Sequence, residues 1–137
     1  MNVVFISPHF PKYYHNFCSR LKDRGVNVLG VGDCPYDMIS DDTKNSLTEY
    51  YYVGSLENYD EVYRACAYFS SHYGKIDWIE SENEYWLELE ATLRRDFNVT
   101  TGPQIQDMRW MKFKSAMKEV YKSAGLKVAD YIKLDTL

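Results

Sequence analysis

The first 31 residues alternate between two short apolar runs and one amphipathic stretch. The runs at 3–6 and 26–31 are rich in valine and other apolar residues, which is typical of strands buried on both faces. Between them, four residues recur at the spacing of one helical face: Tyr14, Phe17, Cys18 and Leu21. Gly25 stands where a helix would end. This pattern predicts two parallel strands joined by a helix.

The same alternation continues along the chain. After a polar loop at 33–48 with one helical turn near 41–47, further strands are predicted at 49–53 and 76–79, each followed by an amphipathic helical pattern. Such an order predicts an α/β fold, a Rossmann-like three-layer sandwich with a mainly parallel sheet. We assign residues 1–103 to this domain. Residues 104–137 follow as a separate segment, with helical periodicity over 107–124 and a strand at 127–132.

Charge and composition exclude several classes of protein. The net charge is −4, which argues against nucleic acid as a partner. No stretch approaches the roughly 20 apolar residues of a membrane span, and the start of the chain does not resemble a signal peptide. Three widely spaced cysteines match neither a disulfide framework nor a zinc site. We therefore expect a cytoplasmic protein with no membrane contact.

Ligands of open parallel sheets bind beyond the carboxyl ends of the strands. Three loops occupy that position here, at residues 7–11, 30–33 and 80–84. His9 is a polar group that could face a ligand in the first loop. The third loop carries Glu80, Glu82 and Glu84, which either form an acidic cap on the following helix or recognise an amine or cation. Both interpretations stay open at this point.

Several familiar motifs are missing or misplaced. The pair Gly30-x-Gly32 follows the second strand, whereas a dinucleotide fingerprint follows the first, so these glycines are interpreted as turn and close-packing residues. The three histidines lack metal-binding spacing. No Walker sequence and no catalytic triad is present. We therefore predict no catalytic residue and no metal ligand. On pattern alone, the lysines of 107–124 form a solvated helix face.

Three segments carry a family resemblance. Residues 107–131, DMRWMKFKSAMKEVYKSAGLKVADY, resemble the entry into an ATP-grasp domain: a basic residue, a helix, then a glycine turn into a strand. The stretches VNVLGVGD at 26–33 and DWIESENE at 77–84 are similar to the preceding domain of bacterial ATP-grasp ligases. The chain thus resembles the N-terminal, pre-ATP-grasp domain of a carboxylate–amine ligase of the biotin carboxylase and carbamoyl-phosphate synthase superfamily, followed by the first helix and strand of the ATP-grasp domain.

This resemblance implies ATP-dependent joining of a carboxylate to an amine through an acyl phosphate, with ATP and Mg²⁺ as cofactors of the complete enzyme. Lys114, eleven residues before Gly125, would contact an ATP phosphate. The first-domain loops would hold a small-molecule carboxylate or amine. The implied substrate-binding residues are Ser7, Pro8, His9, Phe10, Glu80, Ser81, Glu82, Asn83 and Glu84.

In such enzymes the phosphate loop and metal ligands would lie after residue 137. We therefore expect this polypeptide to be a truncated ligase that is inactive alone and binds no cofactor. Its expected partners are the missing catalytic domain or, through an exposed sheet edge, a second copy. The alternative hypothesis is a standalone Rossmann-like module for ligand binding or protein interaction.

Overall fold

A wholly parallel four-stranded sheet forms the centre of the computed structural model, which describes residues 1–132. The strand order is β3-β2-β1-β4, so β1 pairs with both β2 and β4. In the register, Phe5 of β1 lies opposite Gly30 and Glu80. This sheet confirms the predicted α/β fold. The strands are β1 (Asn2–Ile6), β2 (Asn27–Gly32), β3 (Glu49–Tyr52) and β4 (Trp78–Glu80).

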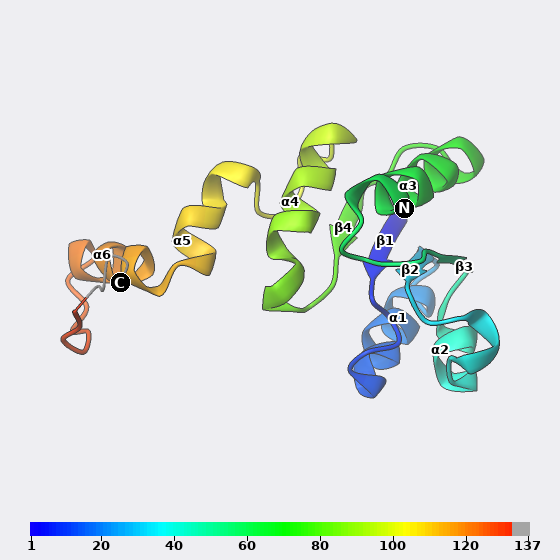
Figure 1. Cartoon of the computed structure of the whole chain (residues 1–137), viewed down its shortest axis with the longest axis horizontal. Coiled ribbons are helices and arrows are strands. Elements are labelled where there is room, and N and C mark those ends of the chain that lie inside the picture. The colour runs from blue at the N-terminus through cyan, green and yellow to red at the C-terminus, as the bar shows by residue number, and fades with distance from the viewer. Residues whose placement is uncertain (133–137) are drawn as a thin grey trace.

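Helices cover both faces of the sheet (Figure 1). Val4 and Ile6 of β1 pack in one buried cluster with α3 and α4. Phe5, on the opposite face of the same strand, packs with α1 and with Leu47 after α2. The alternation of side chains along β1 therefore produces a three-layer sandwich. The helices of these layers are α1 (His15–Lys22), α2 (Asp41–Ser46), α3 (Tyr59–Tyr73) and α4 (Leu87–Asp96).

Helix α3 illustrates how the sequence pattern becomes packing. Val62, Cys66 and Phe69 follow one another at helical spacing, and all three are fully buried against the sheet. The helix ends at Tyr73 because Gly74 takes a φ of +85°, which favours glycine. A short connection at residues 74–77 then returns the chain to the sheet at β4.

The segment after residue 103 projects from this body (Figure 1). It contains α5 (Met108–Lys112) and α6 (Lys114–Ser123), separated by Phe113 in an extended conformation. The predicted strand at 127–132 does not form, and these residues have no regular secondary structure. Tyr131 instead lies against α6, where its hydroxyl donates to the Ser115 carbonyl at 3.3 Å and Lys118 Nζ lies 4.5 Å from its ring centroid. A lone segment with no neighbouring strand has no ladder to join.

The final five residues of the predicted second segment lie outside the described residues, and its boundary at residue 103 stays a prediction. Within residues 1–132, no helix combines the length and the apolar character needed to cross a membrane.

Candidate functional site

The loops that follow β1, β2 and β4 lie side by side at the carboxyl ends of the strands. Because β1 lies between β2 and β4, its carboxyl end brings the three loops together. They form a crevice of about 420 Å³. Ser7 and Glu82, in the first and third loops, both have a left-handed φ of +56°, a conformation that costs energy in residues with a side chain. The crevice is lined by Ser7, His9, Phe10, Asp33, Leu56, Asn83, Tyr85 and Trp86.

His9 and Asp33 form the polar wall of the crevice. His9 Nε2 lies 3.4 Å from Asp33 Oδ1. Burial lowers the pKa of His9 below its ordinary value of 6.5, and the nearby Asp33 carboxylate opposes this only in part. The imidazole is therefore neutral at pH 7, and Asp33 supplies the negative charge. His9 Nδ1 is buried without a hydrogen-bond partner within residues 1–132.

Gly32 makes the position of His9 possible. A Cβ added at Gly32 would lie 2.9 Å from His9 Nδ1 and would also collide with the Tyr50 hydroxyl. The glycine is extended in β2, so its role here is close approach and not a turn. This confirms the close-packing interpretation of Gly32 and removes the turn interpretation.

Asn83 and two aromatic residues also line the crevice. Asn83 Oδ1 accepts a hydrogen bond from the Tyr85 backbone N–H at 3.0 Å, and the Asn83 N–H donates to Ser81 Oγ at 3.1 Å. The Tyr85 hydroxyl donates to the Glu57 carboxylate. These contacts hold the amide and the ring of Tyr85 beside Trp86, whose ring meets that of Tyr85 edge to face.

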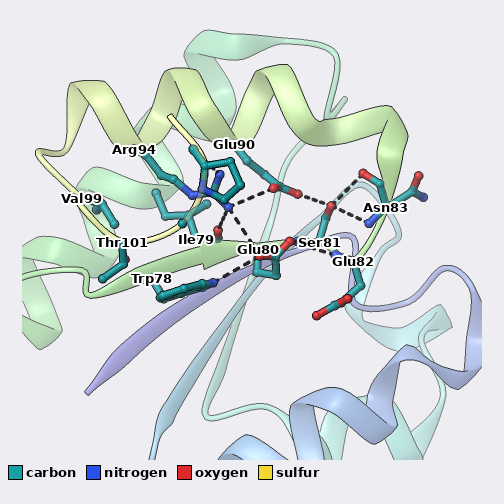
Figure 2. Close-up of polar contacts among 12 residues, drawn as sticks. Trp78, Ile79, Glu80, Ser81, Glu82, Asn83, Glu90, Arg94, Val99 and Thr101 are labelled. Carbon is teal, nitrogen blue, oxygen red and sulfur yellow. Dashed lines mark hydrogen bonds and ion pairs between the residues drawn. The ribbon is translucent and has the colours of Figure 1, made fainter. Parts of the chain in front are cut away.

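A buried ionic network connects α4 to the third loop, which follows β4 (Figure 2). Arg94 of α4 is 1% exposed and donates to the carbonyls of Ile79 and Pro103, the latter at 2.8 Å. Its guanidinium also lies 3.1 Å from Glu90 Oε2 and 3.5 Å from Glu80 Oε2. Ser81 Oγ donates to Glu90, which joins the network to the crevice wall through Asn83.

Glu80 is occupied by contacts within the protein. Besides Arg94, its carboxylate accepts from the backbone N–H groups of Ser81 at 3.1 Å and Glu82 at 3.3 Å, and from Trp78 Nε1 at 3.3 Å. These bonds organise the turn that follows β4. Glu80 therefore shapes the loop from inside, and it does not line the crevice.

The structure separates the predicted substrate-binding residues into two groups. Those that line the crevice are Ser7, His9, Phe10 and Asn83. Those that do not are Pro8, Glu80, Ser81, Glu82 and Glu84. Pro8 and Ser81 are buried, and Glu84 is exposed at the first position of a 3-10 turn, as the acidic-cap interpretation expected. Glu80 and Glu82 line a different, apolar groove. Lys114 is exposed at the start of α6, in the projecting segment far from the crevice (Figure 1).

Besides these four residues, sequence reasoning identified the loop that contains Asp33, but it missed Leu56, Tyr85 and Trp86. Tyr85 and Trp86 directly follow the acidic loop, so their position after a strand end was an available signal. Leu56 comes from the connection between β3 and α3, and no local pattern marks it. Within residues 1–132, no group of three or more His, Cys, Asp or Glu side chains is placed to hold a metal ion.

The crevice therefore offers one carboxylate, one neutral imidazole, one amide and three aromatic rings. These groups suit a small ligand that carries a cationic or hydrogen-donating group beside an apolar part. An amine attached to a hydrocarbon or aromatic side chain has this character. None of the crevice residues is arranged as a nucleophile with a neighbouring base.

Comparison with solved structures finds the fold of an L-amino acid ligase from Bacillus licheniformis. The TM-score is 0.66 at 15% sequence identity, and the match covers 98% of this chain. The chain spans 35% of the length of that ligase. At this identity, the likeness establishes a shared fold. No protein-family model and no curated protein sequence matches the chain.

Proposed function

We propose that this chain is the N-terminal substrate-binding part of an ATP-grasp ligase, which joins a carboxylate to an amine through an acyl phosphate. The observation that carries the proposal is the fold shared with an L-amino acid ligase over 98% of the chain. The sequence resemblance at 26–33, 77–84 and 107–131 supports the same assignment. The crevice adds a place where a small amine or carboxylate would bind.

The described residues do not fit ATP and Mg²⁺ by themselves. Within 1–132 no group of three or more His, Cys, Asp or Glu side chains is placed to hold a metal ion, and Lys114 is exposed at the start of α6. Phosphoryl transfer needs several cations and donors around the transferred group. In this proposal, the nucleotide site is supplied by a catalytic domain that packs beside α6, and the crevice contributes substrate binding only.

Asp33 is the residue that we expect to recognise an amine. Its carboxylate is 38% exposed at the crevice, and His9 beside it is neutral, so the local charge is negative. Phe10, Tyr85 and Trp86 would then contact the apolar part of the ligand.

Calorimetry with a panel of L-amino acids tests this site. Asp33→Asn should weaken binding about tenfold, because a charged partner of the amine is lost. Asp37→Asn is the matched control, since Asp37 is exposed outside the crevice and its substitution should leave the affinity unchanged. Equal affinities for the wild-type protein and Asp33→Asn would contradict the assignment of Asp33.

A second measurement addresses ligase activity. The chain alone, mixed with ATP, Mg²⁺ and candidate acids and amines, should release no ADP above a blank, because residues 1–132 hold no cluster of metal ligands for phosphoryl transfer. Coexpression with an ATP-grasp core encoded in or beside the same reading frame should restore ADP release that depends on both parts. ADP release by the chain alone would show that the expected inactivity is wrong.

The alternative is a standalone Rossmann-like binding module. One observation favours it: the crevice residues already combine a carboxylate, an imidazole, an amide and three aromatic rings around a space of about 420 Å³. Tight binding of a metabolite, together with no ATP-grasp core encoded nearby, would support this alternative over the ligase.

A further inference from the structure

One face of the sheet is left partly uncovered beside β4. The helices α1 and α2 pack over β1, β2 and β3 on the face that carries Phe5, and they leave a groove between α1 and β4. The groove has a volume of about 580 Å³, larger than the crevice, and the two share no lining residue. Its apolar lining consists of Met1, Val3, Phe5, Phe17, Leu21 and Trp78.

Two large side chains at this groove are exposed. Phe17 of α1 is 43% exposed, and Trp78 of the edge strand β4 is 36% exposed. Parallel sheets are normally covered on both faces, because their strands are apolar on both sides. A contiguous apolar groove of this kind, bounded by charged side chains, marks an interaction surface.

The charges at the groove are divided between its two ends. Arg20 and Arg24 lie at the end of α1, next to the amino ends of the strands. Glu80 and Glu82 lie at the carboxyl end of β4. Arg20 has only the exposed Asp23 as an ionic partner, at 3.5 Å, and neither Arg24 nor Glu82 forms an ion pair within residues 1–132.

We propose that a second copy of this chain covers the groove in a two-fold symmetric dimer. A two-fold axis that crosses the line between Arg24 and Glu82 exchanges their positions, so each arginine faces the glutamate of the other copy. The two pairs form together at opposite ends of the interface. Phe17 and Met1 of each copy supply the apolar groups that fill the facing groove. The unequal charges at the two ends favour this self-complementary arrangement over an uncharged apolar occupant.

Sedimentation equilibrium of the full chain tests the proposal. The wild-type protein should dimerise with a dissociation constant on the order of micromolar. Glu82→Arg and Arg24→Glu should each weaken the dimer by about tenfold or more, because each substitution brings like charges together twice. The double variant with both substitutions should recover most of the affinity, since the pair is restored with reversed polarity.

Three controls keep the test specific. Glu84→Arg makes the same charge change at an exposed residue outside the groove and should not alter dimerisation. Phe17→Ser should weaken the dimer by removing an apolar contact, while circular dichroism verifies that each variant is folded. A monomer at several hundred micromolar would overturn the proposal. So would a dimer insensitive to both charge reversals, as pairing through the edge of β4 would give, or a double variant that fails to recover.

Discussion

Glu90 is a carboxylic acid enclosed by the protein, with no exposed surface. Burial raises its pKa from an ordinary value of 4.5 to about 7. The nearby Glu80 carboxylate adds to the rise, whereas the Ser81 hydroxyl and the Arg94 guanidinium oppose it. Desolvation therefore outweighs the ion pair at 3.1 Å, and Glu90 takes up a proton near neutral pH.

This raised pKa predicts a pH dependence of stability. Between pH 4.5 and about pH 7 the folded state binds a proton at Glu90 that the unfolded state has already lost. The free energy of unfolding should therefore fall as the pH rises through this window, by up to about 3 kcal/mol. Urea unfolding at pH 5 and pH 7.5 measures the change. Glu90→Gln should flatten it, and an identical change in the variant would contradict the prediction.

At the scale of elements, Arg94 connects α4 to two other parts of the chain. It donates to the Ile79 carbonyl of β4 and to the Pro103 carbonyl in the connection that follows α4. The guanidinium leaves no room for a side chain at Gly102, since a Cβ there would lie 3.0 Å from Arg94 Nε. The ion network therefore connects α4 to β4 and to the loop that carries Asn83.

Substitution of two neighbouring arginines tests this connection. Arg94→Met should lower the free energy of unfolding by about 3–5 kcal/mol, because Glu90 loses its buried partner. Arg95→Met is the matched control. Arg95 is 56% exposed and its only ion pair within residues 1–132 is with Asp96, so its loss should cost far less stability than the loss of Arg94. Chemical denaturation of both variants gives the comparison, and equal losses would show that α4 does not depend on Arg94.

At the scale of the whole molecule, the residues up to 103 and the projecting segment after them differ in how they are packed. Both core clusters consist of residues from 4 to 99. The segment α5–α6 is joined to the body mainly through α4, with Lys112 Nζ 2.7 Å from Glu88 Oε2 and Met108 buried. Exposed apolar residues remain on the segment, among them Trp110 and Phe113. Such a surface is consistent with the proposed catalytic domain beside it.

Truncation tests the predicted boundary at residue 103. A chain of residues 1–103 should unfold cooperatively, because it retains both core clusters. A chain of residues 1–112 keeps Met108 and Lys112 and should be the more stable of the two, by about 1–2 kcal/mol. Circular dichroism during urea unfolding measures both. Loss of the folded state in residues 1–103 would show that α5 belongs to the same domain.

The crevice could be predicted only in part. The loops after β1, β2 and β4 follow from the rule for parallel sheets, and His9 and Asn83 lie where that rule placed them. The acidic loop was harder, because the orientation of Glu80 depends on Arg94, which is 14 residues away and on another element. Leu56 enters from a connection with no local signal. Each of these depends on contacts that the local sequence does not encode.

The sequence by itself determined the kinds of element and their order, because apolar periodicity and glycine positions act over a few neighbouring residues. It therefore predicted the α/β class and most helix and strand positions. Only the tertiary structure decided the order β3-β2-β1-β4, the burial of Arg94, and the groove left open between α1 and β4. These three features depend on how segments far apart in the sequence pack together. The segment 127–132 shows the same dependence, since a strand-like sequence forms no strand without a neighbour.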